Sequence, residues 1–214
     1  FEQEVNPWIG STQGYGAFID EQMKIEVLWS PLAVMAVRMP GFGHALKANL
    51  ARTKHLAVWD VVVRGTSTGR ILSYSGSNPT VWFHFNQRDC DVAVRGLKLI
   101  AEMFFAAGAT HLLPGIHGLP VELGPTQIDL LKVGAIKPNQ LTVAATHLFG
   151  TCRMGEDPNH SVVDSRGECH DVRNLYVVDS SVMPNGTRVN PHEPIMVLSD
   201  YFSQGIIERM KRQA

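Results

Sequence analysis

The pattern of apolar and polar positions is clearest in the middle of the chain, where β-branched and aromatic residues gather in three short segments. These segments are residues 57–65, 70–74 and 80–86. The turn-forming stretches TSTG and SGSNP separate them, which is typical of consecutive strands. Short connections favour antiparallel pairing, so we expect one antiparallel sheet. Val81, Phe83 and Phe85 predict an apolar face that packs on a core, while the other face meets solvent or a substrate cavity.

Helical spacing of apolar residues marks the segments on either side of these strands. The strongest example is residues 87–109, with Asp89 or Asp91 as the capping residue and Gly108 as the stop. Further helices are predicted at residues 31–38, 44–57, 125–133 and 195–210, and further strands at 24–29, 141–150 and 174–179. The residues expected on the apolar face of the last helix are Ile195, Val197, Leu198, Tyr201, Phe202 and Ile206. Together the elements predict an α+β fold in which helices pack on an antiparallel sheet.

Length, charge and cysteine usage narrow the class of protein. The chain has 214 residues and a formal net charge of −1, which suits one domain or a large piece of a bigger enzyme. The balanced charge argues against nucleic acid and anionic membrane surfaces as partners, and no apolar run approaches the roughly 20 residues that span a bilayer. Three cysteines leave at least one thiol unpaired, which favours a reducing, cytoplasmic compartment. The opening at Phe1 shows no signal segment and reads as a fragment or a processed product.

Candidate chemistry is concentrated in the stretch ATHLFGTCRMG, residues 145–155. His147 precedes a glycine turn, and imidazole is the side chain best suited to general-base catalysis near neutral pH. The alternative is a histidine that only hydrogen-bonds its own loop. Cys152, Cys169 and His170 could join His147 as metal ligands, but their spacing differs from that of the usual zinc pairs. We therefore expect no metal site.

Three blocks of the C-terminal part carry a family resemblance: HLFGTCRMG, SVVDSRGECHDVRNLYVVDSSVMP and VNPHEPIMVLSDYFSQGI. Their order and spacing together resemble the C-terminal part of the glucose–methanol–choline (GMC) family of FAD-dependent oxidoreductases. The resemblance covers residues 141–212, and the earlier part of the chain is similar to the substrate-domain half of that family. It looks closest to the branch that acts on bulky apolar alcohols, such as long-chain alcohols or sterols.

The resemblance implies that the protein oxidises an alcohol to a carbonyl and passes a hydride to flavin N5. By resemblance, His147 takes the hydroxyl proton, and Asn190, 43 residues later, helps to hold the alcohol oxygen. His192 competes for this partner role. Asn190 can also be interpreted as the cap of the last helix, since Asn before Pro suits a helix start. The family also includes hydroxynitrile lyases, which keep the flavin without a redox cycle, so that reaction is an alternative.

The resemblance also implies FAD contacts around the start of the last helix. Asp179 would bind ribityl hydroxyls with the Ser180 backbone beside it, the alternative being a turn former at a strand end. The helix start at Pro191 and His192 would point its positive end at the flavin and stabilise negative charge on the reduced ring. Pro194 departs from the family pattern, which has a hydroxyl residue there. Because proline lacks an N–H, a hydrogen bond to the flavin edge could be lost, or the helix start could shift.

The dinucleotide-binding turn of the family is missing from the sequence, since no G-x-G-x-x-G follows a predicted strand. We therefore expect residues 1–140 to be a portion of a substrate-binding domain, and residues 141–214 to be a C-terminal catalytic and flavin-contacting segment. The N-terminal FAD-binding half would be another part of the protein or another chain. The expected partners are this half, a small-molecule alcohol, and an electron acceptor that is oxygen, a quinone or a cytochrome. A third alternative is a non-catalytic substrate-binding or docking fragment.

Overall fold

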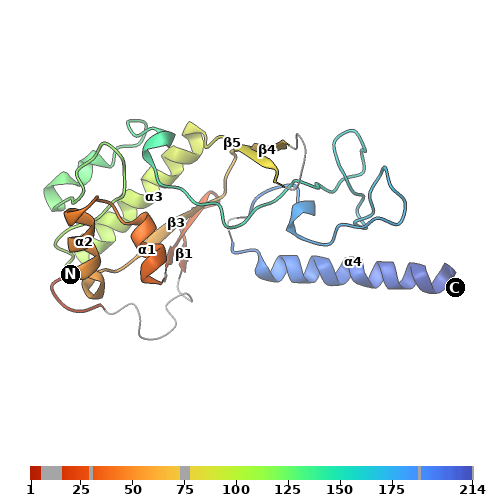
Figure 1. Ribbon diagram of the computed structural model, residues 1–214, viewed down its shortest axis with the longest axis horizontal. Helices are drawn as coiled ribbons and strands as arrows, with labels where there is room; N and C mark the ends of the chain where they lie inside the picture. Colours follow the sequence, from red (N-terminus) through yellow and green to blue (C-terminus); the bar gives the residue numbers. More distant parts are fainter. Residues whose placement is uncertain (6–15, 29–30, 73–77, 188, 214) are drawn as a thin grey trace. The chain divides into compact units, whose positions relative to one another are not determined.

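The computed structural model describes residues 1–5, 16–28, 31–72, 78–187 and 189–213. The chain folds into two compact units, and Figure 1 labels most of their helices and strands. The first unit comprises Phe1–Ser67 and His84–Val143, and the second comprises Thr68–Phe83 and Ala144–Ala214. The chain therefore passes from one unit to the other at three points.

A three-stranded antiparallel sheet forms the centre of the first unit. Its strands are β1 (Gly16–Phe18), β2 (Met23–Val27) and β3 (Trp59–Val63), in the order β1-β2-β3. Ile25 of β2 lies opposite Val61 of β3, and the side chains of Met23 and Ile25 are each only 1% exposed. One face of this sheet is therefore covered, and it is covered by a helix.

The covering helix is α3 (Gln87–Ala106), which contacts both β2 and β3. Its close approach depends on Gly96, because a Cβ there would lie 2.6 Å from Cγ1 of Val61. Apolar residues of α3 and of the loops that follow it build the core of this unit, including Cys90, Val94 and Leu123, which are fully buried. The periodic pattern of residues 87–109 thus predicted this helix correctly.

The caps of α3 differ in part from the prediction. Asn86 is the N-cap, and its side chain accepts a hydrogen bond from the Asp89 N–H at 2.8 Å. The expectation that Asp89 or Asp91 caps the helix is therefore wrong. Gly108, with a φ of +91°, follows the last turn of the helix, which confirms the predicted stop.

Two short helices and several 3₁₀ turns complete the first unit. They are α1 (Leu32–Arg38), α2 (His44–Ala51), η1 (Thr53–His55), η2 (Pro125–Leu130) and η3 (Pro138–Gln140). The helical prediction for residues 31–38 is confirmed, whereas the one for 44–57 holds only in part, because α2 ends at Ala51 and only a 3₁₀ turn follows. The stretch that begins at Pro125 is a 3₁₀ helix rather than an α-helix.

The prediction of one sheet from residues 57–86 is wrong, because β3 pairs with β2 and not with the strand that follows it. The next two strands, β4 (Gly69–Leu72) and β5 (Thr80–Phe83), form a separate antiparallel pair in the second unit. All four residues of β5 are exposed, including Phe83, so β5 has no core-facing side within the described residues. Local spacing predicted the antiparallel pairing of β4 with β5 but not the earlier partner of β3.

Helix α4 (His192–Gln213) lies along residues 163–182 of the second unit. Phe202 is 2% exposed and packs against Val163 and Val182, both fully buried. Val197 and Tyr201, predicted on the same apolar face, are instead 71% and 62% exposed. The buried face of α4 is therefore narrower than its sequence pattern indicates.

Two predicted strands are irregular in the structure. Residues 141–150 hold an isolated bridge from Leu141 to Ile116, and residues 174–179 hold one from Tyr176 to Glu168. Val177 and Val178 of the second stretch are half buried and pack against the cluster that contains Phe202, so their apolar character reflects packing under α4. The combination of helices with antiparallel pairs confirms the predicted α+β class.

Candidate functional site

His147 lies in an irregular loop of the second unit and is half buried. Within the described residues its ring takes part in no hydrogen bond or ion pair. In contrast, His160 pairs with Asp157, and His170 lies 3.0 Å from the Ser161 hydroxyl. The ring nitrogens of His147 are therefore available to a ligand, as a general base requires.

Gly150 shapes the turn that follows His147. Its φ of +77° favours glycine, since other residues are strained in the left-handed region. A Cβ at this position would lie 3.6 Å from the Met183 carbonyl oxygen. The turn thus brings the histidine loop against the segment that leads to helix α4.

Backbone hydrogen bonds hold these two segments together. The Cys152 N–H donates to the Ser181 carbonyl at 3.0 Å. Two residues further on, the Met154 N–H donates to the Val182 carbonyl at 2.8 Å. The position of the histidine loop is therefore set by main-chain groups, and the Cys152 thiol is not needed for it.

Asp179 caps the single 3₁₀ turn η4 (Ser180–Val182). This turn provides the two carbonyl groups that bond Cys152 and Met154. The Asp179 Oδ1 accepts a hydrogen bond from the Ser181 N–H at 2.7 Å. This geometry is that of a turn former. The side chain is also exposed, so the carboxylate can accept hydrogen bonds from ligand hydroxyls as well.

Helix α4 begins at His192, directly after the buried Pro191. The carbonyl of Pro191 accepts the first helical bond, from the Ile195 N–H at 2.9 Å. Pro194 lies in the first turn, where an N–H has no partner within the helix. The helix therefore starts where the family resemblance implied, at His192, and earlier than the residue 195 that the apolar pattern predicted. Asn190 and His192 are both exposed at this end of the helix.

All the predicted site residues belong to the second unit. They are His147, Asp179, Ser180, Asn190, Pro191 and His192. The unit thus combines one candidate base, one amide that both donates and accepts hydrogen bonds, and a helix N-terminus that favours negative charge.

Metal binding by Cys152, Cys169, His170 and His147 was the alternative interpretation of the C-terminal motifs. In the described part of the chain, no group of three or more His, Cys, Asp or Glu side chains is arranged to hold a metal ion. Cys152 and Cys169 are half-buried free thiols, and Cys90 is a buried one. A helix long and apolar enough to cross a membrane is likewise not found among the described residues.

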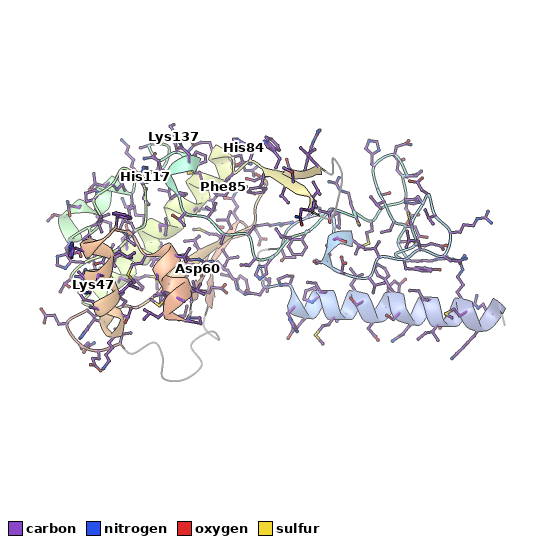
Figure 2. All side chains as sticks on the ribbon, viewed as in Figure 1. Lys47, Asp60, His84, Phe85, His117 and Lys137 are labelled. Atoms are coloured by element: carbon purple, nitrogen blue, oxygen red, sulfur yellow. The ribbon has the colours of Figure 1, made fainter. Side chains whose placement is uncertain are left out.

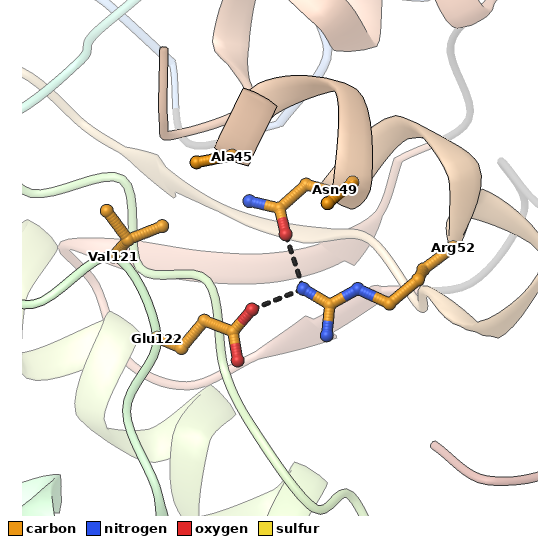
Figure 3. Close-up of a pocket in the computed structure, with 6 residues that line it drawn as sticks. Ala45, Asn49, Arg52, Val121 and Glu122 are labelled. Atoms are coloured by element: carbon orange, nitrogen blue, oxygen red, sulfur yellow. Dashed lines mark hydrogen bonds and ion pairs between the residues drawn. The ribbon is translucent and has the colours of Figure 1, made fainter. Parts of the chain in front are cut away.

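Two shallow hollows lie outside the histidine loop. One of about 510 Å³ opens beside α2 in the first unit, where Arg52 pairs with Glu122 and Asn49 (Figure 3). The other, of about 500 Å³, runs along the β4–β5 pair and is lined by Arg70 and Trp82 among others. Neither is lined by His147 or by another histidine of the described chain.

An ion pair near the C-terminal end of α4 was not predicted from the sequence. Arg209 pairs with the Glu168 carboxylate and donates to the Tyr176 hydroxyl at 3.0 Å. The Asn174 N–H donates to the other oxygen of Glu168 at 2.9 Å. The bond from Asn174, together with Arg209, keeps the pKa of Glu168 below its usual range. These residues are far apart in sequence, so no local pattern marks them.

Asp60 on β3 is a second group that sequence reasoning missed. Figure 2 labels it in the first unit, beside α1. Its Oδ1 is buried without a hydrogen-bond partner among the described residues. Burial, together with the nearby Glu26 carboxylate, raises the pKa of Asp60 to about 6, and Arg38 and Lys24 only partly offset this. The group is unfavourable for folding, and it belongs to the other unit from His147.

Comparison with known proteins gives the family. The family model described as GMC oxidoreductase matches residues 66–199, more than half of the chain. The chain belongs to the GMC oxidoreductase family. The resemblance of its three C-terminal blocks is thereby confirmed.

Several relatives of this GMC chain are known by activity. Over 178 residues it is 40% identical to 2-methyl-1,2-propanediol dehydrogenase of Mycolicibacterium austroafricanum, which covers 76% of the chain and 31% of that protein. Over 172 residues it is 27% identical to long-chain-alcohol oxidase FAO4A of Arabidopsis thaliana, which covers 76% and 23%. The crystal structure of pyridoxine 4-oxidase from Mesorbium loti aligns with a TM-score of 0.47 at 24% identity, covering 69% and 28%. The GMC chain spans less than a third of each of these proteins.

Proposed function

We propose that this GMC chain is the C-terminal part of an FAD-dependent enzyme that oxidises an alcohol to a carbonyl. The observation that carries the proposal is the backbone pairing of Cys152 with Ser181 and of Met154 with Val182. This pairing joins the His147 loop to the segment that ends at Asn190, within one compact unit. Membership of the GMC family supports the reaction class.

His147 and Asn190 divide the work on the alcohol oxygen. A ring nitrogen of His147 accepts the hydroxyl proton, which is consistent with its lack of hydrogen bonds to other described residues. The Asn190 amide orients the oxygen without titrating, and His192 is the competing partner two residues later. Bound FAD would supply the acceptor for the hydride that leaves the substrate carbon. The N-terminus of α4 favours the negative charge that results.

The exposed polar groups of the second unit fit one end of FAD better than the other. The Asp179 carboxylate would suit ribityl hydroxyls, with the Ser180 backbone beside it, and the helix start at Pro191 and His192 would face the ring. The pyrophosphate would need a glycine-rich turn that the sequence lacks after any strand. We propose that an N-terminal FAD-binding half supplies it.

The exposed apolar side of α4 supports such a partner. Met196, Val197 and Tyr201 are all at least 60% exposed on the helix that begins at the proposed site. Contiguous apolar surface of this kind commonly marks a protein interface. In this arrangement residues 1–140 are part of the substrate-binding domain, and residues 141–214 are the catalytic and flavin-contacting segment. The three free thiols support a reducing, cytoplasmic location.

The proposed substrate is an apolar or bulky alcohol. The similarity to a long-chain-alcohol oxidase supports this choice, and the similarity to a dehydrogenase of a small diol is the main counterweight. Comparing kcat/KM for 1-decanol and for 2-methyl-1,2-propanediol in the complete enzyme decides between them. Supplying oxygen, a quinone or cytochrome c in turn identifies the electron acceptor.

The central test replaces His147 with alanine in the complete flavoenzyme. We expect the rate of anaerobic flavin reduction by alcohol to fall by at least about 100-fold, the usual contribution of a general base. His160→Ala is the matched control, because His160 is an exposed histidine paired with Asp157 in the same unit. Flavin reduction at the original rate in His147→Ala would remove the histidine from the mechanism.

Asn190 is tested in the same assay. Loss of a hydrogen bond to the reacting oxygen in Asn190→Ala should cost about 10- to 100-fold, whereas Asn185→Ala, on an exposed position of the same segment, should cost little. A flavin that no alcohol bleaches, together with cyanohydrin cleavage, would favour the hydroxynitrile lyase alternative. A complete protein that binds no FAD would favour the non-catalytic alternative.

A further inference from the structure

Helix α4 carries the proposed site at its first turn, but most of its contacts to the second unit are apolar. Phe202 and Leu198 pack on the cluster around Val163 and Val182. Among the described residues, the one hydrogen bond that joins the middle of the helix to another segment runs from the Ser199 hydroxyl to the Val178 carbonyl at 3.3 Å. Apolar packing is not directional, so these contacts alone do not fix the rotation or the axial position of the helix.

A directional contact is found near the far end, in a group of residues that we name the α4 clasp: Glu168, Tyr176 and Arg209. One guanidinium nitrogen of Arg209 meets both the Glu168 carboxylate and the Tyr176 hydroxyl. Glu168 is itself held by the Asn174 N–H and has a side chain only 16% exposed. A charge-assisted bond to a pre-positioned carboxylate is strong and geometrically specific.

The α4 clasp and the loop that contains His147 both contact one chain segment, residues 163–182. The turn that holds Glu168 contains Gly167, where a Cβ would lie 3.0 Å from the Val177 carbonyl and 3.1 Å from the Phe202 ring. A few residues further along, Ser181 and Val182 bond the chain that follows His147. Residues 163–182 therefore contact both the loop that contains His147 and the helix that begins at His192.

We infer that Glu168 and Arg209 are positioning residues for the proposed active site. Through the clasp they fix the rotation and axial position of α4, and with these the placement of Asn190 and His192 relative to the His147 loop. Arg209 is about 25 Å along the helix from His192, given a rise of about 1.5 Å per residue. A helix transmits a shift over this length, and a misplacement of about 1 Å at a reacting group can cost on the order of 100-fold in rate.

The test uses the complete flavoenzyme, and the inference rests on the function proposed above. Arg209→Met removes the clasp, Arg209→Lys keeps the charge but not the planar fork, and Glu168→Arg with Arg209→Glu exchanges the charges. Arg212→Met is the matched control, because Arg212 pairs only loosely with Glu208, at 3.8 Å, on the exposed side of the same helix. The two readouts are the limiting rate and substrate dependence of flavin reduction, and amide hydrogen exchange across residues 190–198.

We expect Arg209→Met to lower the limiting rate about tenfold and change the half-saturating alcohol concentration less than twofold. Amide exchange at residues 190–198 should become several-fold faster. Arg209→Lys should recover part of the rate, the charge exchange should recover most of it, and Arg212→Met should match the original protein in both readouts. Equal rates in Arg209→Met and Arg212→Met would overturn the inference, as would a slower rate with unchanged exchange.

Failure of the proposed function can be told apart from failure of the clasp. If His147→Ala reduces its flavin normally, the proposed function is wrong, yet hydrogen exchange still decides whether the clasp holds the start of α4. If Arg209→Met loses its flavin or its fold, Arg209→Lys and the charge exchange carry the comparison. No recovery of rate or exchange in either of these would then count against the clasp.

Discussion

The Asp89 carboxylate accepts hydrogen bonds from both the backbone N–H and the hydroxyl of Ser67, the last residue before the chain leaves the first unit. Thr66 donates its N–H and its hydroxyl to the same carboxylate. The side chain of Asn86, which caps α3, donates to the Thr66 hydroxyl at 3.1 Å. One end of the chain segment that forms β4 and β5 is therefore bonded directly to a buried carboxylate, which is 1% exposed, and the other end is bonded to it through Asn86 and Thr66.

Asp89→Asn should destabilise the first unit by about 3 kcal/mol, because an amide NH₂ then faces backbone N–H donors in a buried site. Urea unfolding measures the loss. Asp129→Asn is the matched control, since the Asp129 side chain is 90% exposed in its pair with Lys98. Equal midpoints for the two variants would contradict a structural role for Asp89.

The same carboxylate predicts a loss of stability in acid. Burial alone would raise the pKa of Asp89, but the hydrogen bonds from Ser67 and Thr66 outweigh it and hold the pKa below its usual range. The folded state then binds the proton less tightly than the unfolded state. The stabilisation is present above pH 3.8, the ordinary value for an aspartate, and is lost as the pH falls through the lowered value.

Asp60 predicts the opposite dependence on pH. Its pKa is raised from 3.8 to about 6, first by burial and then by Glu26, so the folded state binds the proton more tightly. Its contribution is favourable below pH 3.8 and is lost as the pH rises through about 6. Asp60→Asn should therefore be more stable than the original by about 1–2 kcal/mol at pH 8, with no gain at pH 3.5. Thermal unfolding at the two pH values checks this, and an equal gain at both would rule out titration as the cause.

Gly96 and Gly205 should respond oppositely to alanine. A Cβ at Gly96 would meet Val61 at 2.6 Å, so Gly96→Ala should cost about 1–3 kcal/mol in spite of the better helix propensity. Gly205, in α4, has nothing within 4 Å of an added Cβ. Gly205→Ala should therefore stabilise α4 by up to about 1 kcal/mol. Denaturant midpoints of the two variants on either side of the original protein would confirm the close approach of α3 to β3.

Cys152→Ser should leave flavin reduction in the complete enzyme nearly unchanged, because the N–H that bonds Ser181 remains. Gly150→Ala should slow it, since alanine is strained at a φ of +77° by about 1 kcal/mol or more and the turn next to His147 would shift. The ratio of the two rates is the measurement. A large loss in Cys152→Ser would give the thiol a role that the main-chain geometry does not require.

Local sequence patterns predicted the elements that form from contacts between residues close together in the sequence. Helix α3 shows its periodicity and its glycine stop in sequence, and β4 and β5 are joined by turn residues. The pairing of β3 with β2 was missed because two helices, α1 and α2, separate these strands in the sequence. The run at residues 174–179 has strand composition because it packs under α4 and not because it joins a sheet.

The site residues were predicted mainly from the order of the three C-terminal sequence blocks. The contacts that hold these residues in place were not predicted. His147 and Asn190 stand in recognisable blocks, but the bonds that join their segments are made by main-chain groups, which carry no sequence signal. Glu168 and Arg209 were missed for a related reason, since a charged pair 41 residues apart looks like ordinary surface charge until the helix is placed. The burial of the Asp60 carboxylate was also missed, because no pattern in the neighbouring sequence marks this charged residue as buried.

The three crossings of the chain between its units have a consequence for synthesis on the ribosome. The β4–β5 strands emerge well before residues 144–214, with which they form one unit. Val81 and Trp82, which are 67% and 56% exposed in the folded chain, lack the rest of their unit throughout this interval. The first unit can fold as soon as residue 143 has emerged. Asp89 then already bonds Thr66 and Ser67, the residues that precede β4. Nascent chains stalled just beyond that point should therefore be the most prone to aggregate, and a chaperone that shields extended apolar segments should act there.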